Sequence, residues 1–488
     1  KEQLLSWRRP IVLLQQKQVL AESINNGLSE LGVLFPYMPL HFLIFEEIDM
    51  PALVFTSANL SDEPILADNR EAMKKLEHVA DAFLVHNREI HNRTDDSVIR
   101  LLGSQVQPIR RSRGYVPSPV PLNFDASGII ATGAELKNTF ALGIEKQAVV
   151  SQHIGDLKNY ETYEFFGDAV NRFLHLFRQQ PHTIVSDMHP DYLSTRFAKN
   201  YHAKLEKQTT TKGQWIQVQH HHAHIASCMT ENNLAENVIG IALDGTGYGE
   251  DGNIWGGEFL KANFSGYQRF AHFEYIPMPG GDKAVNSPWR MALSFLANAF
   301  DDEDEFIDLP FLKDRPTEDI KLILSMIRKE VNSPLTSSAG RVFDAVAALL
   351  GVCNEACFEA EPPMRLESII LESVDDYYSF SFENEVVSFL PAFREIVDDL
   401  RSDITAEAIA AKFHNTIARA VVDVAKVIRN DSGLNKVVLS GGTFQNKYLT
   451  ERAIRILKEK DFEVFTHTLV PCNDGGISLG QLAIAAHK

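Results

Sequence analysis

The residues best suited to chemistry lie between Gln219 and Leu260. Four histidines fall within five positions of the segment QHHHAH. His220 and His224 are four apart, so a helix would place both imidazoles on one face. The apolar strand VIGIAL that follows ends at Asp244, which could add a carboxylate oxygen. Two imidazoles and a carboxylate predict a bound transition metal, and this donor set suits zinc and iron alike.

The turn after Asp244 carries a second chemical signal. Its sequence LDGTGYG alternates glycines, and Gly245 and Gly247 would let the backbone approach a phosphate. The alternative is a glycine hairpin in which Asp244 forms an Asx-turn. The segment LSGGTFQN repeats the pattern of a strand, two glycines and a helix start, whose free N–H groups favour an anion. This segment contributes Ser440, Gly441, Gly442 and Asn446.

Two shorter motifs extend these signals. In GAELKN, Gly133 frees a turn and Lys137 is placed to meet a phosphate, although a turn with one lysine is common. In NDGG, Asp474 starts a helix and is either a plain N-cap or a fourth metal ligand. The histidines do not form HExxH, because no Glu follows the first one, so the base of a zinc protease is missing. His221 and His222 would point elsewhere, as supporting or substrate-contacting groups.

Composition limits the classes of function. With 488 residues, 44% of them hydrophobic, the chain should form two to four domains. Its apolar runs are too short to span a bilayer, so we expect no membrane partner. Four scattered cysteines favour a reducing, cytoplasmic compartment. A net charge of −18 disfavours nucleic acid and favours a protein or small-molecule substrate. Because the chain opens with Lys1, we expect an N-terminally truncated fragment.

Residues 1–120 are predicted to form one α/β unit. RRPIVLL should be a strand, and PALVFTSANLSDEPI a buried strand running into a polar turn. That turn, with Thr56, Ser57 and Asn59, would be either a phosphate or ribose cradle or an ordinary helix cap. Four arginines further on could converge on an anion, or could each be a surface charge: Arg100, Arg110, Arg111 and Arg113. A proline-rich stretch then predicts a linker at residues 121–127.

Residues 128–488 alternate short strands and helices. A hairpin followed by a third strand is predicted at the start, and VIGIALDGTGYG with IWGGEFLKANF begins the same pattern again. Two such halves predict a duplicated, two-lobed α/β fold of the actin-like ATPase type, with lobe one at about 128–235 and lobe two at about 236–488.

Taken together, these motifs resemble the HypF family of hydrogenase-maturation carbamoyltransferases. The resemblance covers essentially the whole chain, in the right order, and rests on TSANLSDEPI, HNRTDDSVIR with IRRSRGYVP, GAELKNTFAL, HIGDL, SDMHPDY, VQHHHAHIAS, LDGTGYGEDGNIWGGEF, SSAGRVFDAVAALLG and LSGGTFQN. It implies a YrdC-like domain entered partway, followed by a carbamoyltransferase domain related to TsaD and TobZ. The fold class is therefore expected to be α/β throughout.

The resemblance also implies a reaction. Family members hydrolyse carbamoyl phosphate, use ATP with Mg²⁺ to make carbamoyl-AMP, and pass the carbamoyl group to the C-terminal cysteine of HypE. The product becomes a cyanide ligand of a NiFe centre. The family's acylphosphatase and zinc-finger regions are missing from this sequence. We therefore expect transfer from carbamoyl-AMP, but not the hydrolysis of carbamoyl phosphate.

Residue by residue, the resemblance implies three sets of site residues. The metal, zinc or iron, would be held by His220, His224, Asp244 and Asp474, of which the first three act in catalysis with Lys137. The nucleotide would be lined by Lys137, Asn138, Asp344, Gly441, Gly442 and Asn446. The adenylate-forming cavity of the YrdC-like part would be faced by Thr56, Ser57, Asn59, Ser97 and Arg111.

Two other classes of function remain open. An actin-like ATPase or sugar kinase would share the fold, but such enzymes work with Mg²⁺ and carboxylates and do not need paired histidines. A non-catalytic docking module of the maturation complex would keep the fold without the chemistry. The intact histidine and glycine motifs argue against that alternative.

Overall fold

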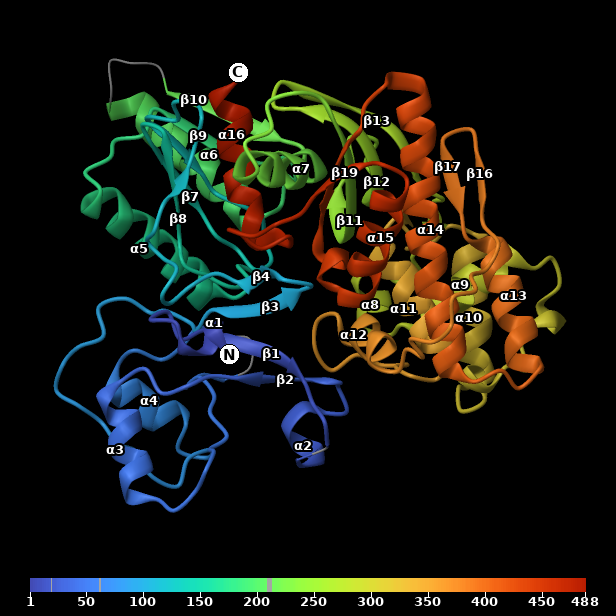
Figure 1. Cartoon of the computed structure of the whole chain (residues 1–488), viewed down its shortest axis with the longest axis horizontal. Coiled ribbons are helices and arrows are strands. Elements are labelled where there is room, and N and C mark those ends of the chain that lie inside the picture. Colours follow the sequence, from blue (N-terminus) through green and yellow to red (C-terminus); the bar gives the residue numbers. More distant parts are fainter. Residues whose placement is uncertain (19, 61–62, 209–212) are drawn as a thin grey trace. The chain divides into compact units, whose positions relative to one another are not determined.

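The computed structural model describes all residues except 19, 61–62 and 209–212 (Figure 1). The described residues form two compact units. The first consists of Lys1–Asn25, Glu30–Leu234 and His467–Lys488, and the second of Asn26–Ser29 and Ala235–Thr466. None of the helices among the described residues is long and apolar enough to cross a membrane.

The N-terminal part of the first unit is a four-stranded sheet with a small core. Its strands lie in the order β2 (Glu30–Val33), β1 (Ile11–Gln15), β3 (Val98–Leu102), β4 (Gln105–Arg110), so the strand predicted from RRPIVLL is confirmed. The short helices here are α1 (Glu2–Leu5), α2 (Glu22–Asn25), α3 (Pro39–Glu47) and α4 (Asn69–Lys75). Leu4, Val12 and Ile99 form the core cluster.

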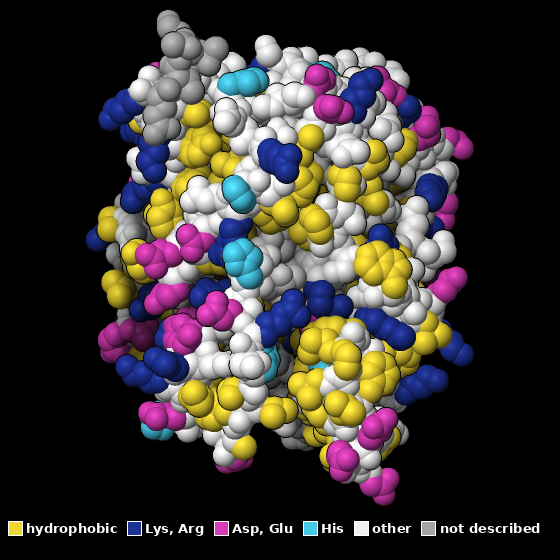
Figure 2. Space-filling view, turned by 90° about the vertical axis from the view of Figure 1, so that its left-hand side faces the viewer, with side chains coloured by type: hydrophobic (Ala, Val, Ile, Leu, Met, Phe, Trp, Pro, Cys, Tyr) yellow, Lys and Arg dark blue, Asp and Glu magenta, His cyan; other side chains and the backbone are white. Residues whose placement is uncertain are grey.

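The strand predicted in PALVFTSANLSDEPI is wrong. Residues 52–57 form no regular element, and the side chains of Val54 and Phe55 are 79% and 53% exposed. A strand needs a hydrogen-bonded neighbour, and no described strand pairs with this run. Apolar residues indicate a tendency to form a strand but do not supply a partner. Figure 2 shows apolar side chains (yellow) at the surface of one face of the molecule.

The second sheet of the first unit has the order β10 (Gln214–Val218), β9 (Thr183–Asp187), β6 (Ile129–Ala131), β7 (Ala141–Ile144), β8 (Gln147–Val150), β5 (Val120–Pro121). Strands β6, β7 and β8 are antiparallel, as the predicted hairpin and third strand require, whereas β6, β9 and β10 are parallel. The helices of this part are α5 (Tyr160–Leu176), α6 (Leu193–Gln208), α7 (His220–Glu231) and α16 (Ile477–Ala486). Phe140 packs edge-to-face on Phe166 and Phe173 in the core.

The second unit repeats this strand pattern. Its sheet has the order β16 (Ser381–Glu383), β17 (Val386–Ser388), β13 (Gly266–Phe273), β12 (Ile254–Asn263), β11 (Val238–Tyr248), β18 (Lys436–Ser440), β19 (Glu463–Phe465), with β14 (Ile276–Pro277) and β15 (Leu335–Thr336) beside it. Strands β13, β12 and β11 are antiparallel, and β11, β18 and β19 are parallel. The order β8-β7-β6-β9-β10 therefore recurs as β13-β12-β11-β18-β19, which confirms the predicted duplication.

Helices complete the second unit. They are α8 (Asp282–Asn286), α9 (Trp289–Ala299), α10 (Thr317–Arg328), α11 (Ala339–Leu349), α12 (Glu361–Ser368), α13 (Leu390–Arg401), α14 (Ala406–Ser432) and α15 (Lys447–Glu459). Single 3₁₀ turns are η1 (Glu303–Glu305), η2 (Pro310–Leu312) and η3 (Gly442–Gln445); a fourth, η4 (Asp474–Gly476), belongs to the first unit. Helices α8 to α13 lie in the long stretch between β14 and α14.

The C-terminal segment returns to the first unit, although lobe two was predicted to run to residue 488. Helix α16 is buried from Ile477 to Ala485 and packs against α7. The two helices are in close contact at Gly480, where a Cβ would lie only 1.9 Å from the carbonyl oxygen of Ala223. The predicted domain boundaries stay a prediction. The packing of α16 against α7 brings the segment His467–Lys488 to the helix that carries the histidines.

Candidate functional site

Helix α7 presents the predicted histidine pair. It begins at His220 because the Gln219 side chain caps it, accepting the His222 N–H at 2.9 Å. The imidazoles of His220 and His224 lie on one face, with ring centroids 5.0 Å apart. The Oδ1 atom of Asp474 is 3.7 Å from His220 Nε2 and 3.6 Å from His224 Nε2. The structure therefore brings these three predicted ligands together within the first unit.

A residue that the sequence reasoning missed orients His220. The buried Asp187, which ends β9, accepts a hydrogen bond from His220 Nδ1 at 2.8 Å and another from the His189 N–H at 2.9 Å. This leaves Nε2 of His220 directed at Asp474 with its lone pair. A carboxylate on the far nitrogen is the usual support of a metal-ligating histidine. The signal was present in SDMHPDY, where an aspartate ends an apolar strand.

The three residues fit a transition metal. Their ligand atoms lie within 4.8 Å of one another, and both histidines are almost fully buried, while 13% of the Asp474 side chain stays exposed. Two imidazole nitrogens and a carboxylate oxygen with an accessible side suit zinc or iron with an open position. Asp244, the remaining predicted ligand, lies in the second unit, and its part in the metal site stays a prediction.

Asp244 ties strand β11 to the turn that follows β18. Its Oδ1 atom accepts the N–H of Gly245 at 2.8 Å and that of Gly442 at 3.0 Å. The predicted glycine turn directly after Asp244 is not a turn, because β11 continues to Tyr248 with a register irregularity after Leu243. The position of a Cβ on Gly245 faces open space, so the backbone there is approachable.

Gly441, the first glycine after β18, is required by close packing. Gly441 has a φ of 102°, and a Cβ on it would lie 2.2 Å from the carbonyl oxygen of Leu243. Ser440, which ends β18, is fully buried, and Gly442 begins the short turn η3. Asn446 caps α15 through the Leu449 N–H and donates from its amide to Nε2 of His414 at 2.9 Å.

Asp344 is linked to the backbone at Gly245 through Arg341. Its buried carboxylate accepts a hydrogen bond from Arg341 Nε at 2.7 Å, and Arg341 Nη1 reaches the carbonyl oxygen of Gly245 at 3.4 Å. Ser338, the N-cap of α11, also donates to this oxygen, at 2.7 Å. Burial raises the pKa of Asp344 to about 6. In this structure Asp344 therefore supports the strand region that carries Gly245.

The GAELKN turn is braced by buried polar contacts in the first unit. Gly133 has a φ of 71°, and a Cβ on it would lie 2.1 Å from the carbonyl oxygen of Thr139. The Asn138 amide donates to the carbonyl oxygens of Thr132 at 2.9 Å and of Ala134 at 2.6 Å. Lys137 adopts a left-handed φ of 44°, and its N–H donates to Asp156.

The predicted residues of the YrdC-like part have structural contacts. Ser97 is buried, donates to the carbonyl oxygen of Arg113 and accepts the Ser112 N–H. The buried Arg111 guanidinium donates to backbone carbonyls, those of Val150, Tyr115 and Ser118, and burial lowers its pKa to about 10. Thr56 and Ser57 are exposed, and Ser57 donates to the Asn59 side chain.

The other arginines of this region each have a carboxylate partner. Arg100 pairs with Glu30, Arg110 with Asp95 and Arg113 with Asp96. The structure thus favours separate ion pairs over four arginines that converge on one anion.

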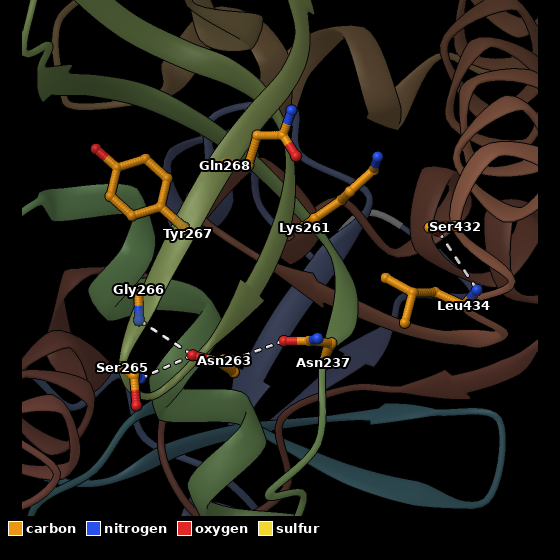
Figure 3. Close-up of a pocket in the computed structure, with 9 residues that line it drawn as sticks. All are labelled: Asn237, Lys261, Asn263, Ser265, Gly266, Tyr267, Gln268, Ser432 and Leu434. Carbon is orange, nitrogen blue, oxygen red and sulfur yellow. Dashed lines mark hydrogen bonds between the residues drawn. The ribbon is translucent and has the colours of Figure 1, made fainter.

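The second unit also has a hollow. It has a volume of about 500 Å³ and is lined by Asn237, Lys261, Asn263, Ser265, Gly266, Tyr267, Gln268, Ser432 and Leu434 (Figure 3). The Lys261 ammonium pairs with Asp431. None of the predicted site residues lines this hollow, so it is not the candidate site.

Three family profiles match consecutive parts of the chain. The profile described as "Telomere recombination" (Sua5, YciO and YrdC) matches residues 1–112. The one described as "HypF Kae1-like domain" matches residues 125–231. Residues 240–481 match "Carbamoyltransferase, Kae1-like Domain, second subdomain".

Individual relatives agree with these profiles. A carbamoyltransferase HypF of Synechocystis sp. is 37% identical over 99% of this chain and 63% of its own length. A carbamoyltransferase HypF homolog of Cupriavidus necator is 34% identical over 76% of this chain and 94% of its own length. The chain spans just under two thirds of the first of these relatives.

Solved structures extend the likeness to the fold. Full-length HypF in a phosphate- and nucleotide-bound form superposes with a TM-score of 0.93 at 45% identity, covering all of this chain and 75% of that one. The structure of T. kodakarensis HypF gives a TM-score of 0.92 at 36% identity, covering 99% of this chain and 64% of that one. Motif order, profiles, sequence identity and fold agree, and the chain belongs to the HypF carbamoyltransferase family.

Proposed function

We propose that this chain transfers a carbamoyl group from carbamoyl-AMP to the C-terminal cysteine of HypE. In this proposal ATP and carbamoyl phosphate are the sources of carbamoyl-AMP, Mg²⁺ accompanies the ATP, and the product serves the cyanide ligands of a NiFe hydrogenase. The observation that carries the proposal is the buried group of His220, His224 and Asp474, found in a chain of the HypF family.

The side chains of this group have defined tasks. His220, His224 and Asp474 would hold the metal, and a bound zinc or iron would polarise an oxygen of the acyl adenylate as a Lewis acid. Asp187 fixes the tautomer of His220 by accepting its Nδ1–H. Burial of both imidazoles excludes water from their ring faces and restrains their rotation.

The backbone at Gly245 and Gly441 would approach the phosphate of the nucleotide. Gly245 leaves open space beside the chain, and Gly441 allows β18 to end against β11. Lys137, which lies in the braced GAELKN turn, offers a positive charge to an anion. The net charge of −18 supports a protein tail, not a nucleic acid, as the acceptor. Four free cysteines support a reducing compartment, the cytoplasm.

One experiment tests the transfer. The chain is mixed with HypE and either carbamoyl-AMP or carbamoyl phosphate plus ATP, and intact mass spectrometry follows the C-terminal cysteine of HypE. We expect modification with carbamoyl-AMP, strongly reduced by His220→Ala or His224→Ala. His175→Ala, which changes an exposed histidine of the same unit, is the matched control. Transfer at the full rate by both histidine variants would contradict the proposal, as would ATP hydrolysis without any modified HypE.

A further inference from the structure

Helix α7 carries a second series of ligand-type side chains on the face of the predicted metal site. Cys228 and Glu231 lie four and seven positions after His224, so successive turns of the same helix face present them. Both are in the first unit, and neither was singled out from the sequence as a ligand. The Cys228 residue and the Glu231 carboxylate are completely buried.

His467 completes this second group from another part of the chain. It opens the C-terminal segment that returns to the first unit, and it is 2% exposed. One ligand atom each of Cys228, Glu231 and His467 lies within 4.8 Å of the others. The Nδ1 atom of His467 is 3.2 Å from Oε1 of Glu231. Donor atoms bound tetrahedrally to zinc lie about 3.3–3.8 Å apart, so this spacing is close to that of a zinc site.

Backbone donors hold the Glu231 carboxylate in place. Its Oε1 atom accepts the Thr468 N–H at 2.8 Å, and Oε2 accepts those of Leu469 at 2.7 Å and Val470 at 3.0 Å. These three hydrogen bonds fix the direction of the carboxylate. Carboxylates that bind metals are commonly oriented by hydrogen bonds of this kind.

We propose that Cys228, Glu231 and His467 bind a zinc ion, a site separate from the His220–His224–Asp474 group. Thiolate sulfur, imidazole nitrogen and carboxylate oxygen are the donors that zinc takes in proteins. A thiolate and a carboxylate together balance the charge of a divalent cation, which offsets the cost of burying them. Water would take the fourth position.

The position of this site gives the zinc a structural task. His467 and Asp474 belong to one segment, and Cys228 and His224 belong to one helix. A zinc ion held at Cys228, Glu231 and His467 would therefore fasten the segment to α7 and keep Asp474 beside His220 and His224. Zinc at this site would hold the candidate active site in shape without touching the substrate.

Cobalt is the direct probe of the thiolate. The metal-free chain is titrated with Co²⁺ alone, and we expect a thiolate-to-cobalt charge-transfer band. Cys228→Ala should abolish the band, whereas Cys353→Ala, which removes a buried thiol of the second unit, should keep it. The absence of this band from the folded wild-type chain would overturn the proposal without any variant.

Metal stoichiometry separates this site from the proposed active site. After titration with Zn²⁺, the wild-type chain should hold two ions, and the double variant His220→Ala/His224→Ala should still hold one. Adding His467→Gln to the double variant should remove that ion. If the folded double variant holds no zinc, Glu231 and His467 form only a hydrogen-bonded clamp and the proposal fails. This result does not depend on carbamoyl transfer.

Discussion

The two units differ at equivalent strand ends: one has a functional side chain there, and the other has glycines that expose the backbone. Strand β9 of the first unit corresponds to β18 of the second in the repeated order. β9 ends in Asp187, a side chain that orients His220, whereas β18 ends in Ser440 followed by two glycines. Under the proposed function, the first unit would offer side chains to a metal, and the second would offer backbone to a phosphate.

This difference determines how each unit fails. In the first unit, removing an imidazole deletes a ligand but leaves the backbone path intact. In the second, a side chain added at a glycine collides with a carbonyl oxygen and changes the backbone itself. Substitution of the histidines of the first unit should therefore lower activity, whereas substitution of Gly441 in the second unit should lower stability.

The largest effect is expected from His224→Ala. Loss of an imidazole from the predicted metal site should lower carbamoyl transfer roughly a thousandfold, about 4 kcal/mol of transition-state stabilisation. The circular dichroism of the variant should stay that of the folded chain. If transfer falls only because the variant is unfolded, the contrast between the two units is lost.

Gly441→Ala should instead destabilise the second unit. A Cβ 2.2 Å from the Leu243 oxygen forces the backbone to move, and we expect a loss of about 3 kcal/mol or more in the free energy of unfolding by urea. Gly433→Ala is the control, because Gly433 has a φ of 73° but open space around its Cβ. It should cost only about 1 kcal/mol. Equal losses in the two variants would show that the collision does not matter.

Acid should weaken the contact between His414 and Asn446, the residue that ends the turn η3. Burial lowers the pKa of His414, the partner of Asn446, from 6.5 to about 4. Its neutral form therefore contributes stability that is present above pH 6.5 and lost as the pH falls toward 4, on the order of 3 kcal/mol.

The measurement is the difference in unfolding free energy between the wild type and His414→Gln, which removes this titration. That difference should shrink as the pH is lowered from 7 to 4.5. A difference that stays constant over this range would mean that folding does not lower the pKa of His414.

The smallest effect is expected from Asp187→Asn. The amide keeps the shape but weakens the hold on the His220 Nδ1–H, so metal affinity should fall about 10- to 100-fold. Competition with a chelator measures this change, and Asp168→Asn, on the exposed side of α5, should leave the affinity unchanged. An unchanged affinity in Asp187→Asn would show that the carboxylate does not act through His220.

Local patterns in the sequence were enough for much of this account. The spacing of His220 and His224 predicted one helix face, and strand–turn–strand repetition predicted the duplicated fold. Asp187 was missed because its contact with His220 joins residues 33 positions apart. The strand expected at PALVF failed because a strand depends on a partner that its own residues do not encode. The return of α16 to α7 is likewise a property of packing, not of sequence order.

The most direct test is the intact mass of HypE after incubation with this chain and carbamoyl-AMP. The account predicts one added carbamoyl group on the C-terminal cysteine, with the reaction lost in His220→Ala and His224→Ala and kept in His175→Ala. An unmodified HypE in the presence of folded, metal-loaded wild-type chain would contradict the account.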